Sequence, residues 1–148
     1  MNFDIKFDFQ RRDRLGLIEA IWGQDKSIDQ LERLCGNVLS KNEVVFITRI
    51  NSEKANYLLD LYDDARFYEE ANCLTIGKNF NKIITNKKVA IISGGSSDLA
   101  VTLEAQLALE IYGVNCQSFI DVGVAGLHRL MSQLEEINKY DVLIVCAG

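Results

Sequence analysis

The second half of the chain alternates short apolar runs with helix-length segments, and this alternation limits the fold more than any other feature. The strand-length runs cover residues 89–93, 116–120 and 141–146, of which the first and the third are apolar, and the segments between them cover 99–112 and 127–138. The runs have the length of buried strands, and the longer segments have the length of helices. Strands that alternate with helices predict an α/β domain with a parallel sheet built from βαβ units.

The first half predicts a smaller α/β unit over residues 1–77. Ser27 can cap a helix whose apolar residues recur at helical spacing. A β-branched run over 44–50 is typical of a buried strand, and Asn51 or Ser52 can cap the helix that follows it.

The borders of this unit have weaker patterns. Between residues 3 and 9 Phe or Ile occupies every second position, which predicts a short strand or an extended arm. Residues 65–77 are expected to add one or two short strands. Residues 78–86 are polar and rich in Asn, so we predict a linker between the first unit and a second domain over 87–148.

Composition narrows the class of protein. The chain of 148 residues is 48% apolar and 25% charged, which is ordinary for a globular protein. Its net charge of −5 argues against broad electrostatic binding of nucleic acid or of an anionic membrane. The sequence has no run that is apolar and long enough to span a bilayer and no signal-peptide core. We therefore expect a cytoplasmic protein whose partners are neither nucleic acid nor membrane.

Several reactive or aromatic side chains have a structural interpretation. The cysteines at positions 35, 73, 116 and 146 match no paired motif, so we expect reduced thiols and no metal site. Cys146 lies in an apolar run and is interpreted as a core residue. Trp22, Tyr57 and Tyr62 are expected in the core or on a helix face. The arginines at positions 11, 12, 14 and 49 are expected on solvated surface.

The first candidate site directly follows the strand predicted at 89–93. Its residues are Gly94, Gly95, Ser96, Ser97 and Asp98. Parallel α/β sheets bind ligands at the carboxyl ends of their strands. Here glycine allows close approach of a ligand, the hydroxyls can donate, and the start of the next helix offers unpaired N–H groups to an anion. A loop without function, with Asp98 as the helix cap, is an equally good interpretation.

The second candidate site follows the next strand and opens on the same edge of the sheet. Its residues of interest are Asp121, Gly123, Gly126, His128 and Arg129. His128 is the only histidine, and imidazole exchanges protons near neutral pH. Arg129 suits a carboxylate or a phosphate. A lone histidine at a helix start is more often structural than catalytic, but two polar loops on one edge favour a site.

These loops resemble a known family. The sequences Gly-Gly-Ser-Ser-Asp at 94–98, Glu104-Ala105 and Asp-Val-Gly-Val-Ala-Gly-Leu-His-Arg at 121–129 resemble LarB. LarB proteins act in nickel-pincer cofactor biosynthesis and are related to the PurE class of aminoimidazole ribonucleotide (AIR) carboxylases and mutases. Arg14, Gly16, Glu19 and Lys26-Ser27 also fit the family, so the resemblance covers nearly the whole chain. It implies that 87–148 is the first half of a PurE-like, Rossmann- or flavodoxin-like domain of three layers.

The chain departs from the family in sequence and in length. The family often has Ala-Gly-Thr-Ser-Asp in place of 94–98, and a proline in place of Ala100. LarB-like proteins continue beyond the match to 147–148, and the resemblance puts their nucleophilic cysteine in that further part. We therefore expect a fragment that is inactive as a carboxylase by itself, with the strand at 141–146 as a bare edge.

The resemblance implies an activity. LarB-like enzymes convert nicotinic acid adenine dinucleotide, CO₂ and water to pyridinium-3,5-biscarboxylic acid mononucleotide and AMP. It also implies Mg²⁺ as a cofactor, CO₂ or bicarbonate as co-substrate, and a homo-octamer. Asp98, Asp121 and His128 would lie nearest the chemistry. The substrate-binding residues would be Gly94, Gly95, Ser96, Ser97, Gly123, Gly126 and Arg129.

Two other functions remain open. The chain can be a non-catalytic module for nucleotide binding or assembly, or it can carry out classic AIR carboxylase (NCAIR mutase) chemistry. The long leader before residue 87 and the form of the loop at 121–129 disfavour the second of these.

Overall fold

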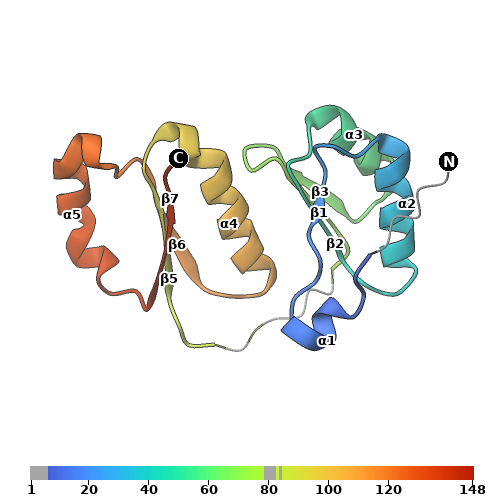
Figure 1. The fold of residues 1–148 in the computed structure, drawn as a ribbon, viewed down its shortest axis with the longest axis horizontal. Coiled ribbons are helices and arrows are strands. Elements are labelled where there is room, and N and C mark those ends of the chain that lie inside the picture. The colour runs from blue at the N-terminus through green and yellow to red at the C-terminus, as the bar shows by residue number, and fades with distance from the viewer. Residues whose placement is uncertain (1–6, 79–82, 84) are drawn as a thin grey trace. The chain divides into compact units, whose positions relative to one another are not determined.

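The computed structural model describes residues 7–78, 83 and 85–148. The chain divides into two compact units, Met1–Asn79 and Phe80–Gly148, and each has its own sheet (Figure 1). Helices and strands alternate in both units, and parallel strand pairs occur in both, which confirms the predicted α/β fold class.

The first unit is a mixed sheet with helices. Its helices are α1 (Arg11–Leu15), α2 (Ile28–Leu39) and α3 (Ser52–Leu61), and its strands are β1 (Ile21–Trp22), β2 (Val45–Thr48), β3 (Ala65–Tyr68) and β4 (Cys73–Ile76). The strand order is β1-β2-β4-β3, in which β1 and β2 are parallel and β4 is antiparallel to both neighbours. The range 65–77 holds two strands as predicted, whereas α1 and β1 have no counterpart in the sequence prediction.

Residues 7–9 correct the expectation of a strand near the amino terminus. Phe7 and Phe9 belong to no strand, because the Phe9 N–H donates to the Phe7 carbonyl at 3.1 Å and the chain turns into α1. Their rings lie 5.0 Å apart, and Phe7 packs against the core. Alternating Phe residues here form an aromatic pair instead of one face of a strand. Positions 3 and 5 lie outside the described residues.

Local hydrogen bonds fix the starts of α2 and α3. The Gln30 N–H donates to Ser27 Oγ at 3.3 Å and the Ser27 N–H donates to Gln30 Oε1 at 2.9 Å, which is a capping box. The Lys54 N–H donates to Asn51 Oδ1 at 3.0 Å. Strands β2 and β4 are buried along their whole length. The core between them and the two helices includes Leu31, Leu34, Val38, Ile47, Ala55, Leu58 and Leu74.

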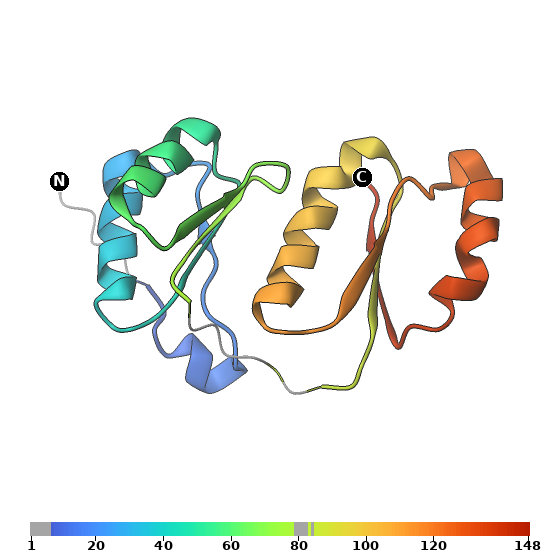
Figure 2. The ribbon, with the colours of Figure 1, turned by 180° about the vertical axis from the view of Figure 1, so that it is seen from behind.

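The second unit is a three-layer α/β/α arrangement. Its elements are β5 (Val89–Ser93), the 3₁₀ turn η1 (Ser96–Asp98), α4 (Leu99–Ile111), β6 (Cys116–Phe119), the 3₁₀ turn η2 (Val124–Gly126), α5 (Leu127–Ile137) and β7 (Val142–Cys146). The strands are parallel in the order β6-β5-β7. Figure 2 shows the sheet between α4 and α5. The steps from β5 to β6 and from β6 to β7 run in opposite directions, so right-handed connections place the helices on opposite faces.

Burial differs sharply between the central strand and the edge strand β7. Ala90 and Ile91 of the central strand β5 are fully buried. Val142, Leu143 and Val145 of β7 are 47%, 50% and 64% exposed. Within the described residues β7 is therefore an apolar edge, as predicted.

Candidate functional site

The loops after the three parallel strands meet at the carboxyl edge of the sheet. The Val122 N–H, after β6, donates to the Ser93 carbonyl of β5 at 3.0 Å. The Gly94 N–H, after β5, donates to the Cys146 carbonyl of β7 at 2.9 Å. These bonds continue the sheet ladder by one residue on each side of β5, so the three loops leave the sheet at one level.

Two glycines allow the loops to touch. A Cβ atom on Gly123 would lie 2.1 Å from the Gly94 carbonyl oxygen, which no side chain can accept. A Cβ atom on Gly94 would lie 3.0 Å from the Cβ atom of Ala147. Gly94 and Gly123 therefore serve first to bring the backbones of the loops together.

Asp98 joins the loop after β5 to the segment after β7. The Gly95 N–H donates to Asp98 Oδ2 at 2.9 Å, and the Gly148 N–H donates to Asp98 Oδ1 at 3.3 Å. Asp98 occupies the N-cap position of α4, but its side chain makes no cap hydrogen bond to that helix. The interpretation of Asp98 as a cap is confirmed for the η1 turn, where its carboxylate accepts from the Gly95 N–H in a capping box, but not for α4. The same carboxylate also holds the chain after β7.

Asp121 and Arg129 form an ion pair within the second loop. Arg129 Nη1 donates to Asp121 Oδ2, and both side chains are partly exposed. Asp121 has a left-handed backbone with a φ of 60°, which is uncommon outside Gly, Asn and Asp. A Cβ atom on Gly126 would lie 2.4 Å from Arg129 Nε, so Gly126 makes room for the arginine side chain. The pair holds the loop, and Arg129 Nε is buried with no hydrogen-bond partner among the described residues.

The remaining polar residues of the two loops are exposed. His128 lies in the first turn of α5, and Ser96 and Ser97 form the η1 turn. Asp98 and His128 follow the parallel strands β5 and β6, so both lie at the carboxyl edge of the sheet. The structure thus leaves the imidazole in solvent and ties the Asp98 carboxylate to backbone N–H groups.

A cavity of about 460 Å³ opens between the three loops. Of the expected site residues, Gly94, Gly95, Asp98 and Gly123 line it. Ser96, Ser97, Asp121, Gly126, His128 and Arg129 do not. The rest of the wall is mainly apolar and includes Val122, Val124, Leu130 and Val145. Such a volume suits a small ligand with an apolar or aromatic part.

The sequence analysis missed the contribution of the third strand to this cavity. Val145, Ala147 and Gly148 line it because β7 pairs with the far side of β5. The order of strands in a sheet depends on contacts between distant segments. The apolar run at 141–146 indicated a strand but not its position beside β5. Cys146, interpreted as a core residue, is instead half-buried.

Two of the thiols are held in their neutral form. Burial raises the pKa of Cys35 to about 12, and burial is also the main cause that raises the pKa of Cys116. A thiol whose pKa is raised in this way is a poor nucleophile. These two cysteines therefore have structural roles.

Within residues 7–78, 83 and 85–148, no three His, Cys, Asp or Glu side chains gather as metal ligands would. Among the helices of the same residues, none has the length and apolar character needed to cross a membrane.

The fold and the cavity together define the class of protein. It is an α/β protein with a ligand-sized cavity at the carboxyl ends of parallel strands. Residues 3–78 match the LarB/PurE-like N-terminal domain, and the chain belongs to this carboxylase-related family. An uncharacterized protein of Methanocaldococcus jannaschii is 33% identical over 152 residues, an alignment that covers 97% of this chain. The chain spans 59% of the length of that relative.

Proposed function

We propose that the chain takes part in the carboxylation of nicotinic acid adenine dinucleotide. The reaction consumes CO₂ and water and releases pyridinium-3,5-biscarboxylic acid mononucleotide and AMP. Membership of the LarB/PurE-like family supports this proposal. The observation that carries it furthest is the cavity itself, in which glycine backbone and valine side chains surround Asp98 at the edge of the parallel sheet. Apolar walls suit a pyridinium ring and CO₂.

The ring chemistry needs a covalent step. A thiolate adds to the electrophilic pyridinium, and the resulting enamine-like C5 attacks CO₂. A base then removes the C5 proton, and the thiolate leaves as aromaticity returns. Water cleaves the phosphoanhydride to release AMP. Burial raises the pKa of both Cys35 and Cys116, and the family resemblance assigns the nucleophile to none of the four cysteines. We therefore propose that another cysteine supplies the thiolate.

Side chains of the two loops have different proposed roles. His128 is exposed at the carboxyl edge and is the proposed base. Asp98 is a proposed positioning residue, because both carboxylate oxygens accept backbone N–H groups. Arg129, already oriented by Asp121, is the proposed contact for a substrate phosphate.

A resident Mg²⁺ ion does not fit the described residues. Among the described residues of the cavity wall, Asp98 has the only side-chain carboxylate, and both of its oxygens accept backbone N–H groups. Asp121 is paired with Arg129. We derive no step through Mg²⁺, which would accompany the pyrophosphate of the substrate.

The test uses this chain and the M. jannaschii relative in parallel. Each is incubated with nicotinic acid adenine dinucleotide, isotopically labelled bicarbonate and Mg²⁺, and the products are analysed by mass spectrometry. We expect the chain to bind the dinucleotide by calorimetry, and the relative to release labelled dicarboxylated mononucleotide and AMP in equal amounts. A chain that does not bind the dinucleotide would contradict the proposal.

The same experiment separates the two other functions. Binding by both proteins without turnover by either would favour a non-catalytic nucleotide-binding module. Turnover of an aminoimidazole ribonucleotide in place of the dinucleotide would favour classic AIR carboxylase chemistry.

A further inference from the structure

The first unit has its own pair of adjacent loops at the ends of parallel strands. Strands β1 and β2 pair in parallel with Trp22 opposite Thr48, so the loops that lead into α2 and α3 start side by side. The Gly23 N–H donates to the Thr48 carbonyl at 2.8 Å. A Cβ atom on Gly23 would lie 2.9 Å from Ile47 Cγ2, so the close approach of the loops requires glycine. This is the edge of a parallel pair at which α/β proteins bind ligands.

Lys54 fastens the two loops together. Lys54 lies in the first turn of α3, and its Nζ donates to two carbonyls of the loop after β1: to Gly23 at 3.0 Å and to Gln24 at 2.8 Å. The ammonium group is therefore used to hold the loops. A charge that binds a ligand at this edge must come from elsewhere.

Arg49 and Trp22 provide that charge and an aromatic surface. The guanidinium carbon of Arg49 lies 4.9 Å from the centre of the Trp22 ring, which is a cation–π contact. Trp22 is 44% exposed, so its interpretation as a core residue is wrong. The Trp22 Nε1–H donates to Asp25 Oδ2 at 3.1 Å, which fixes the orientation of the ring.

The guanidinium of Arg49 is held without being neutralised. Arg49 is exposed, and among the described residues no ion pair involves it. Its backbone φ of 51° is left-handed, a conformation that an arginine seldom adopts. The guanidinium carbon lies over the indole ring, and no ion pair among the described residues uses the Arg49 N–H donors, so they are available to a bidentate oxyanion.

We infer that Trp22 and Arg49 form a second binding site, separate from the cavity of the second unit, for a small aromatic anion. The Arg49 fork binds the oxyanion, which is a phosphate or a carboxylate, and the exposed indole and guanidinium planes stack with the aromatic ring. This site goes beyond the proposed carboxylation and uses none of its residues.

The single tryptophan of the chain makes the test specific, because all tryptophan fluorescence comes from Trp22, whose ring is part of this site. The intact chain is titrated with inosine 5′-monophosphate and with benzoate, which separate phosphate from carboxylate. Inosine alone and inorganic phosphate alone are the controls, because each is one half of inosine 5′-monophosphate. We expect at least one of the two aromatic anions to change Trp22 fluorescence at saturable, submillimolar to millimolar concentration, and to bind more tightly than inosine or inorganic phosphate.

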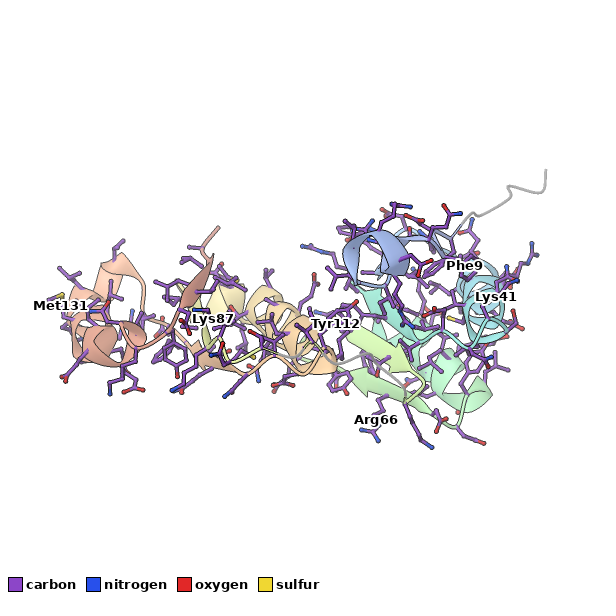
Figure 3. All side chains as sticks on the ribbon, turned by 90° about the horizontal axis from the view of Figure 1, so that it is seen from below. Phe9, Lys41, Arg66, Lys87, Tyr112 and Met131 are labelled. Carbon is purple, nitrogen blue, oxygen red and sulfur yellow. The ribbon has the colours of Figure 1, made fainter. Side chains whose placement is uncertain are left out.

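Variants identify the groups responsible. Arg49→Asn removes the guanidinium but suits the left-handed backbone, and it should weaken binding about tenfold or more. Arg49→Lys keeps the charge without the fork and should weaken binding to a smaller extent. Arg66→Gln is the matched control: this exposed arginine of β3 lies on the opposite edge strand, and Figure 3 shows its side chain directed away from the ribbon.

Several results would overturn the inference. They are no response to either aromatic anion by fluorescence or calorimetry, equal affinity for inorganic phosphate, and an unchanged affinity in Arg49→Asn. Gly123→Ala, which alters only the cavity of the second unit, should leave binding here unchanged. Failure of this site is thereby distinguished from failure of the proposed carboxylation.

Discussion

Gly123 and the carbonyl oxygen of Gly94 lie so close that a Cβ atom on Gly123 would be 2.1 Å from that oxygen. The two residues belong to loops that follow different strands, β6 and β5, and their contact forms one wall of the cavity. Backbone packed against backbone cannot move aside as the end of a flexible side chain can. The cavity therefore depends on glycine at position 123.

Gly123→Ala should push the two loops apart. Overpacking of this kind costs about 1–3 kcal/mol in unfolding free energy, and the affinity for a ligand of the cavity should fall with it. Hydrogen exchange of the β5 and β6 amides, followed by mass spectrometry, measures the loss. Gly95→Ala is the control, since the nearest atom to its Cβ would be 3.7 Å away. Equal exchange in both variants would contradict the close contact.

Asp98→Ala should free two backbone N–H groups from their shared acceptor. The loss of hydrogen bonds to a carboxylate costs about 1.5–3 kcal/mol each, less where the groups reach solvent. The expected result is faster amide exchange at Gly95 and Gly148, measured by NMR. Asp98→Asn keeps one acceptor oxygen and should lie between wild type and Asp98→Ala. Glu135→Ala, at an exposed position of α5, should change neither amide.

Cys35 should make the stability of the first unit fall at alkaline pH. Its pKa is raised by burial from an ordinary 9.0 to about 12 in the folded state. Below pH 9 the thiol is protonated whether folded or unfolded, so its contribution is complete. Between pH 9 and about 12 only the unfolded chain releases the proton, and stability falls by about 1.4 kcal/mol per pH unit at most.

Urea unfolding followed by Trp22 fluorescence measures this slope, since Trp22 and Cys35 belong to the same unit. Cys35→Ala is less stable at neutral pH because it leaves a small cavity, but its stability should fall less steeply between pH 9 and 12. Parallel pH profiles of the two proteins would show that Cys35 does not cause the decline.

Gly36→Ala should stabilise the first unit. Gly36 is exposed within α2, and its Cβ would meet only Tyr62 Oη at 4.0 Å. Alanine in a helix interior is favoured over glycine by about 0.5–1 kcal/mol. The same urea experiment measures the gain. Gly77→Ala should destabilise the unit instead, because its φ of 100° disfavours a side chain and its Cβ would lie 3.1 Å from Val44 Cγ1.

Much of the fold was predictable because its signals are local. Ser27 and Asn51 each accept a hydrogen bond from the backbone N–H three residues further on. Both partners of each cap therefore lie within four consecutive residues, and the cap can be predicted from the local sequence. The strand-length segments at 89–93, 116–120 and 141–146 were recognisable because they alternate with helix-length segments, which is the pattern of a parallel sheet with helices on its faces.

Local patterns failed where a distant contact decides the outcome. The alternation near Phe7 and Phe9 is that of a strand, but their ring contact and the turn into α1 give a different structure. Strand β1 is too short to show any periodicity, and it exists because it pairs with β2.

The candidate site shows the same division. The sequence by itself determined that Gly94 to Asp98 and Asp121 to Arg129 follow parallel strands, and therefore that they share one edge of a sheet. Tertiary structure decided which of these side chains line the cavity and what each one contacts. The Gly148 N–H meets the Asp98 carboxylate 50 residues away, and Arg49, directly after β2, lies over the ring of Trp22 in the neighbouring strand β1. Such contacts depend on strand order and on the directions of single side chains, which sequence spacing does not encode.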